Sequence, residues 1–90
     1  MAILVKFSVS GATVEKYEAV RRRLEEVGAG TPPGQLYHVS YGSRENLQVI
    51  DVFDSQQSLE ALGKTLLPIL NEMGITAQPE IQEVYKIVKG

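Results

Sequence analysis

The single histidine of this 90-residue chain is a candidate for acid–base chemistry. His38 lies among apolar and hydroxyl-bearing residues in the segment 36–41, and Asp51 interrupts the apolar run 47–53. An unpaired carboxylate buried in such a run would be costly, so Asp51 needs a partner or water. A carboxylate beside an imidazole orients the ring, and an oriented imidazole is the commonest general base in enzymes. His38 and Asp51 are therefore the candidate catalytic pair.

The register of the two segments decides whether this pair can form. With a two-residue loop at Ser43 and Arg44, His38 opposes Val49, and Asp51 is its diagonal neighbour on the same face. A loop one residue longer or shorter places His38 and Asp51 on opposite faces. The sequence leaves both arrangements open. It also leaves open that His38 is a half-buried, hydrogen-bonded strand residue and that Asp51 bonds the backbone or a helix end.

Three further side chains are candidate substrate-binding groups. Tyr41 and Tyr85 combine apolar area with a hydroxyl, which suits a position at a cleft or an interface. Lys6 lies on the less apolar face of the first expected strand and is predicted to face the same cleft. Tyr17, in contrast, lies on the apolar stripe of an expected helix and is interpreted as a packing residue.

Hydrophobic periodicity predicts the elements that must position these residues. They are strands at Ile3–Val9, Gln35–Tyr41, Asn46–Phe53 and Ile81–Val88, with helices at Thr13–Val27 and Ser55–Met73. The order βαββαβ indicates a ferredoxin-like α+β fold. Numbered along the chain, the strands should form an antiparallel sheet in the order 4-1-3-2, with both helices on one face. We expect a single domain spanning residues 1–90, with His38 on the face away from the helices.

Two features of the expected helices bear on this interpretation. Pro68 lies inside the second helix, where it removes a backbone hydrogen bond, so a kink or a break is predicted at Leu67–Pro68. The run Arg21–Arg23 could suggest an anion site, but Glu18 precedes it and Glu25 and Glu26 follow it at helical spacing. These glutamates favour a solvated face of compensating charges.

Composition excludes several classes of function. The net charge of −2 disfavours nucleic-acid binding, and the absence of cysteine excludes disulfides and thiolate metal sites. No other metal-ligand cluster is recognisable, so no metal or other cofactor is expected. The apolar N-terminus is too short for a signal peptide or a membrane span, which predicts a cytoplasmic protein that does not bind membranes.

Several segments resemble the dimeric α/β-barrel superfamily, near the antibiotic-biosynthesis monooxygenases. The similar segments are Leu36-Tyr37-His38-Val39-Ser40, Val49-Ile50-Asp51-Val52-Phe53-Asp54-Ser55, Leu66-Leu67-Pro68-Ile69-Leu70 and Gly74-Ile75. Phe53 stands where the family often has Trp. Only His38 and Asp51 match motif positions that could carry chemistry.

The resemblance implies a homodimer in which two sheets pack into a barrel, with a cleft between sheet and helices in each subunit. It also implies cofactor-independent monooxygenation of a planar phenolic or enol compound, with Tyr41 or Tyr85 holding an oxyanion. The haem-degrading relatives use a His and a Trp that this sequence does not offer. The alternative is a non-catalytic dimer with a structural or ligand-binding role. The residues alone do not decide whether the protein is an enzyme.

Overall fold

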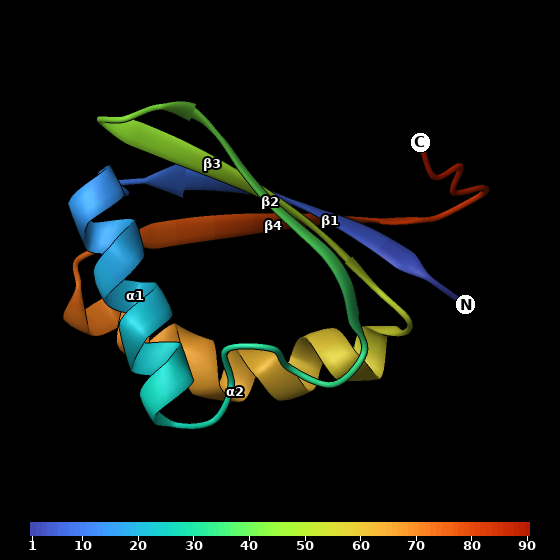
Figure 1. Ribbon diagram of the computed structural model, residues 1–90, viewed down its shortest axis with the longest axis horizontal. Helices are drawn as coiled ribbons and strands as arrows, with labels where there is room; N and C mark the ends of the chain where they lie inside the picture. Colours follow the sequence, from blue (N-terminus) through green and yellow to red (C-terminus); the bar gives the residue numbers. More distant parts are fainter.

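The six elements follow each other in the order β1, α1, β2, β3, α2, β4. A computed structural model describes residues 1–90 and places them at β1 Ile3–Ser10, α1 Val14–Glu26, β2 Gln35–Ser43, β3 Asn46–Phe53, α2 Gln56–Glu72 and β4 Thr76–Glu83. The sheet order is β2-β3-β1-β4 and every neighbouring pair is antiparallel. Both helices cover the same face of the sheet (Figure 1). The predicted ferredoxin-like fold and strand order are confirmed.

Polar side chains define where both helices begin. The Thr13 hydroxyl accepts a hydrogen bond from the backbone N–H of Lys16 at the start of α1. Ser55 does the same for Ser58 at the start of α2. Each cap satisfies a backbone donor that has no partner within its helix. The predicted helix starts are therefore correct to within one residue.

Alternation along the strands separates the two faces of the sheet. On β1, Ile3 and Val5 are buried against the helices, whereas Leu4 and Lys6 lie on the other side. The buried core is small, and it contains Ile3, Val5, Ala12, Val20, Leu24, Phe53, Leu62, Ile69 and Ile75. Only 11 of the 90 residues are buried in all. This thin core leaves room between the sheet and the helices, and leaves the opposite face of the sheet without cover.

The last strand differs from the prediction. Residues 81–88 read as a strand, but β4 begins at Thr76 and ends at Glu83. Proline within a strand is tolerated on a sheet edge, and β4 is an edge strand in which Pro79 pairs with Phe7. Its partner β1 begins at Ile3, so the pairing ends with the bond from the Val84 N–H to the Ala2 carbonyl. Residues 85–88 therefore have no neighbouring strand within the chain.

Of the kink or break predicted at Leu67–Pro68, the break is wrong. α2 runs without interruption through Pro68 to Glu72. Leu62 and Ile69 on its inner face are buried, whereas Leu67 is largely exposed. Burial of this apolar stripe holds the helix together across the position where proline removes a backbone bond. Neither helix is long and apolar enough to cross a membrane.

Candidate functional site

The β2–β3 hairpin brings His38 and Asp51 directly opposite each other. The register pairs Ser43 with Asn46, so the two-residue loop is Arg44-Glu45 and not Ser43-Arg44. This change shifts each cross-strand partner by two residues. His38 and Asp51 therefore still share a face, and they lie directly opposite each other instead of diagonally. The Nδ1 of His38 lies 2.5 Å from the Oδ1 of Asp51.

The face on which this pair lies is the opposite of the one predicted. His38 and Asp51 point toward the helices, on the same side as Val5 and Phe53, and not onto the uncovered face. A bulge between Gln35 and Tyr37 lies just before His38 in β2. The side chain of Asp51 is only 4% exposed, and that of His38 is 25% exposed. The carboxylate is satisfied, because Gln35 Nε2 also donates to its Oδ1 at 3.3 Å.

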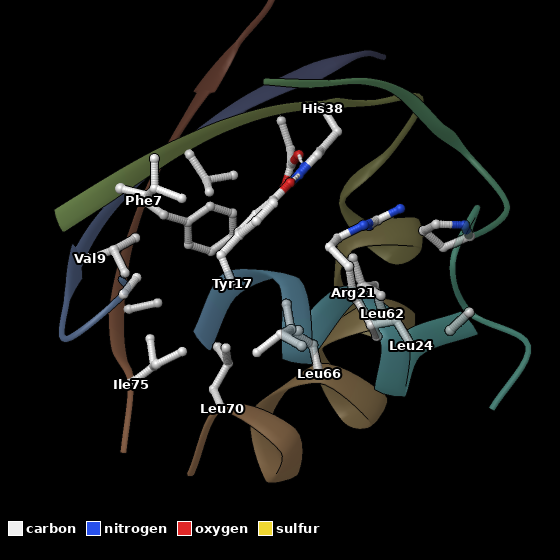
Figure 2. A pocket seen from close by; sticks show the side chains of 18 of the residues that line it. Phe7, Val9, Tyr17, Arg21, Leu24, His38, Leu62, Leu66, Leu70 and Ile75 are labelled. Carbon is white, nitrogen blue, oxygen red and sulfur yellow. Dashed lines mark hydrogen bonds and ion pairs between the residues drawn. The ribbon is translucent and has the colours of Figure 1, made fainter. Parts of the chain in front are cut away.

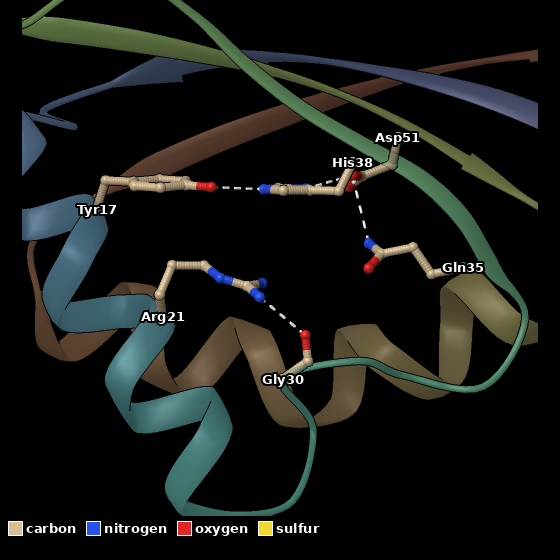
Figure 3. A network of polar contacts seen from close by, with 6 residues as sticks. All are labelled: Tyr17, Arg21, Gly30, Gln35, His38 and Asp51. Carbon is tan, nitrogen blue, oxygen red and sulfur yellow. Dashed lines mark hydrogen bonds and ion pairs between the residues drawn. The ribbon is translucent and has the colours of Figure 1, made fainter.

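A third residue, Tyr17 of α1, completes a chain of hydrogen bonds. Its hydroxyl lies 2.7 Å from the Nε2 of His38. The two rings are nearly parallel, at 5°, with centroids 6.0 Å apart, and they meet through the hydroxyl and the ring nitrogen (Figure 3). We call Tyr17, His38 and Asp51 the polar chain. It links a helix to two strands of the sheet.

The donors and acceptors assign the protons along the polar chain. A carboxylate only accepts hydrogen bonds, so His38 Nδ1 carries the proton that faces Asp51. A neutral imidazole then presents Nε2 as an acceptor, and the Tyr17 hydroxyl donates to it. The oxygen of Tyr17 retains lone pairs for a further donor. A ligand hydroxyl bonded there would be connected to His38 through Tyr17.

The polar chain lies at the wall of a cavity between the sheet and the helices, which we call the sheet–helix cavity. Its volume is about 90 Å³, and 14 of its 19 lining residues are hydrophobic. Phe7, Val9, Leu66 and Leu70 are among them, and Figure 2 shows these side chains surrounding the same space as Tyr17 and His38. A largely apolar cavity with a few convergent polar groups is typical of a small-molecule site. No group of three or more His, Asp or Glu side chains is arranged to hold a metal ion.

Arg21 is the one arginine or lysine that lines this cavity. Its Nη2 donates to the carbonyl oxygen of Gly30 at 2.8 Å. The predicted pairing of the arginine run with its neighbouring glutamates is wrong, because the single ion pair of this run joins Arg23 to Glu72 of α2 at 2.9 Å. Arg22 is exposed.

The three predicted substrate-binding side chains lie outside the cavity lining. Tyr41 and Lys6 are exposed on the sheet face that carries no helices. Tyr85 follows the end of β4 and is fully exposed. The structure thus brings together His38 and Asp51 but not Tyr41, Tyr85 or Lys6.

Sequence reasoning missed Tyr17, Arg21 and Gln35 as members of the site. The signal for the first two is helical spacing, since positions 17, 20, 21 and 24 fall on one face of α1. A hydroxyl and a guanidinium on the stripe that holds Val20 and Leu24 must point toward the interior. Gln35 carries no comparable signal, because its approach to Asp51 depends on the bulge in β2.

No protein-family model matches the chain, and no curated protein is significantly similar to it. Solved structures do resemble it. One is SnoaB from Streptomyces nogalater, a cofactor-independent oxygenase, with 21% sequence identity and a TM-score of 0.61. The match covers 99% of this chain and 96% of SnoaB.

Two further similar structures are candidate antibiotic biosynthesis monooxygenases. The protein from Chloroflexus aurantiacus J-10-fl has a TM-score of 0.64 at 15% identity, covering 98% of this chain and 96% of its own. The protein from Deinococcus radiodurans has a TM-score of 0.62 at 12% identity, covering 99% and 97%. The structural neighbours of this chain are therefore monooxygenase-like proteins of ferredoxin-like fold, and at these identities the likeness establishes the fold alone.

Proposed function

We propose that this protein binds a small planar phenol or enol in the sheet–helix cavity and acts on it as a cofactor-independent monooxygenase. The observation that carries the proposal is the polar chain at the wall of an apolar cavity, with Tyr17 Oη 2.7 Å from His38 Nε2. The fold shared with SnoaB is consistent with it.

Cavity size restricts the ligand. An engineered cavity of roughly 150 Å³ in another protein is large enough to hold benzene. The sheet–helix cavity, at about 90 Å³, accommodates at most about one ring unless it opens. A single-ring phenol or enol therefore fits the observed volume better than a polycyclic one.

The polar chain supplies the proton transfer that such a reaction needs. Tyr17 accepts the hydroxyl proton of the ligand while passing its own proton to His38 Nε2, and Asp51 stabilises the resulting imidazolium. The deprotonated ligand is an electron-rich carbanion equivalent that reduces O₂ and forms a carbon–oxygen bond at the ring. The peroxide anion formed takes the proton held by His38 and becomes a hydroperoxide. Neutral His38 then accepts the ring proton through Tyr17 as the O–O bond breaks to leave a carbonyl. His38 returns a proton to the departing hydroxide, so one phenol and one O₂ give one quinone and one water.

The test uses 1,3-dihydroxybenzene, a single-ring compound with phenol and enol character, under ¹⁸O₂. The expected products are 2-hydroxy-1,4-benzoquinone with one ¹⁸O atom and one labelled water, detected by mass spectrometry of the quinone. His38→Gln should reduce the rate by about 10²- to 10⁴-fold, the usual contribution of general acid–base catalysis. Binding without oxygen uptake would instead support a non-catalytic ligand-binding protein.

A matched ligand pair tests the hydroxyl site separately. 4-Methylphenol and toluene differ in the group that Tyr17 would recognise. Calorimetry should show tighter binding of 4-methylphenol to the wild-type protein and no such preference in Tyr17→Phe. Equal binding of the two compounds by the wild-type protein would contradict the proposed role of the polar chain.

We also propose that the protein is a homodimer formed through the sheet face without helices. This open face carries Leu4, Lys6, Tyr37, Val39, Tyr41, Ile50 and Val52. Val39 is 51% exposed, and an apolar patch of this kind is uncommon on a monomer unless it binds something. Tyr41, predicted at a cleft or an interface, and Lys6, predicted to face the same cleft, would both lie in the interface.

The exposed area supports the same proposal. The chain exposes 5904 Å², whereas a monomer of its mass of 9.9 kDa typically exposes about 5,200 Å². The excess is close to the roughly 800 Å² that each partner buries in a standard interface. A twofold axis allows one open face to cover another.

A further inference from the structure

Arg21 is a half-buried cation that has no anionic partner within the protein. The structure's ion pairs join Arg23 to Glu72 and His38 to Asp51, and neither involves Arg21. Glu18 and Glu25 lie within one helical turn on α1, but neither forms an ion pair with Arg21. A guanidinium stays protonated, so this charge must be balanced by solvent or by a ligand.

Most of the hydrogen-bonding capacity of Arg21 is unused by the protein. A guanidinium has five N–H donors in a planar fork, and the structure shows one hydrogen bond, from Nη2 to the Gly30 carbonyl. That bond directs the side chain along the cavity wall. A side chain at residue 30 would have its Cβ within 2.7 Å of Glu25 Cγ, so the loop that supplies this carbonyl is closely packed against α1. The remaining donors are available to a planar anion.

Arg21 and Tyr17 present their polar ends to the same space. They are four residues apart on α1, and Figure 3 shows both side chains extending from the helix in the same direction. Residues at this spacing are neighbours on one helix face, about one turn or 5.4 Å apart along the axis. A ligand that contacts both residues therefore carries two polar groups about one helical turn apart.

The negative charge in the cavity does not oppose this arrangement. Asp51 is the one acidic residue of the lining, its side chain is 4% exposed, and it is hydrogen-bonded to both His38 and Gln35. Arg21 is therefore the charged side chain of the cavity lining that is available to bind a ligand.

We infer that the ligand of the sheet–helix cavity is an aromatic or enolic acid, whose carboxylate binds Arg21 while its hydroxyl bonds Tyr17. This inference rests on the proposed function, since it specifies the substrate class of the same site. The guanidinium fork suits a carboxylate, which it can bind through two parallel hydrogen bonds. Arg21 then determines specificity and orientation, and the polar chain handles the proton.

The experiment compares 4-hydroxybenzoate with 4-hydroxybenzamide by titration calorimetry. The two probes share ring, hydroxyl and planar substituent, and they differ in charge. The wild-type protein should bind the carboxylate about 10- to 100-fold more tightly, the range expected for hydrogen bonds to a charged group. Arg21→Gln should remove this preference and leave the affinity for the amide within about twofold. Arg21→Lys, which keeps the charge but not the fork, should retain part of it.

Arg22→Gln is the matched control, because Arg22 is the neighbouring exposed arginine of the same helix. It should leave both affinities unchanged, which separates a site effect from the loss of one net charge. If Arg21→Gln weakened both probes equally, its role would be to hold the Gly30 loop, and the inference would be wrong.

The wild-type protein alone separates the inference from the proposed function. Equal affinity for the acid and the amide, or binding of 4-methylphenol but not of 4-hydroxybenzoate, would overturn the carboxylate site and leave the hydroxyl site standing. Binding of none of the three phenols would overturn both.

Discussion

The hydroxyl of Tyr17 lies 2.7 Å from the Nε2 of His38, although the two residues are 21 positions apart and belong to a helix and a strand. Both residues line the sheet–helix cavity. The Tyr17 hydroxyl occupies the one acceptor nitrogen that His38 retains once Asp51 has taken the other. Any base catalysis by His38 therefore passes through Tyr17 or requires that Tyr17 move.

Removing the Tyr17 hydroxyl tests which of these holds. Tyr17→Phe keeps the ring packed on α1 and should cost only about 1 kcal/mol of stability, the typical value of one hydrogen bond. If protons pass through Tyr17, turnover of 1,3-dihydroxybenzene should fall by about 10²-fold or more. Tyr37→Phe, on the open face, is the control and should leave turnover unchanged. Faster turnover in Tyr17→Phe would show that Tyr17 blocks His38 instead.

Asp51 should hold His38 in one tautomer. ¹⁵N chemical shifts of the imidazole are expected to show the proton on Nδ1 in the wild-type protein. Asp51→Ala removes the acceptor and should give a mixture of tautomers. Because the substitution also leaves Gln35 Nε2 and His38 Nδ1 without their buried partner, we expect a loss of roughly 2–4 kcal/mol in denaturant unfolding. A wild-type proton on Nε2 would contradict the assigned direction of the polar chain.

The carboxyl of Asp54 should titrate at lower pH than an ordinary aspartate. Ser58 Oγ donates to its Oδ1 at 2.6 Å and Ser55 Oγ at 3.2 Å, and these bonds, chiefly that of Ser58, hold the pKa of Asp54 below its usual 3.8. The unfolded chain thus binds this proton more tightly than the folded one. The resulting stabilisation is complete above the unfolded-state pKa and disappears as pH falls through the folded-state pKa.

Ser58→Ala tests this coupling. The substitution removes the shorter hydrogen bond, so the pKa of Asp54, followed by NMR of its side chain, should rise toward 3.8. Ser8→Ala, at an exposed strand position, should leave the titration unchanged. An unaltered midpoint in Ser58→Ala would assign the low pKa to another cause.

Gly34 should tolerate no side chain, for two separate reasons. Its φ of +84° is strained for other residues, and an added Cβ would lie 2.6 Å from Asp54 Oδ1 and against the Ser58 side chain. Gly28 has a similar φ of +78° with open space around it. Gly28→Ala should therefore lose about 1–2 kcal/mol from backbone strain alone. Gly34→Ala should lose a further 1–3 kcal/mol or so from overpacking. Equal losses in urea unfolding would contradict the clash.

The homodimer predicts a mass of about twice 9.9 kDa in light scattering at micromolar concentration. Val39→Lys places a charge on the open face and should shift the protein toward the monomer. Glu60→Lys, which introduces a lysine at an exposed position on α2, should leave the mass unchanged. A wild-type species of about 10 kDa would rule out the proposed interface.

Local patterns in the sequence determined the fold and the identity of the candidate catalytic pair. Alternation along residues 3–9 and 46–53, and the helical stripes with their Thr13 and Ser55 caps, specify elements whose order admits few topologies. A lone histidine and a carboxylate in an apolar run were visible for the same reason. Such signals depend on neighbours within one strand or one turn, and the sequence contains them directly.

Only the tertiary structure decided which face of the sheet holds the site. The two-residue loop of the hairpin places His38 and Asp51 on the same face of the sheet. Apolar residues occur on both faces of the strands, so the hydrophobic pattern did not say which face the helices cover. The Tyr17 contact depends on how α1 packs across β2, and the extent of β4 depends on where its partner β1 begins. These are relations between elements far apart in the chain. Tertiary packing determines these relations, and the local hydrophobic periodicity does not encode them.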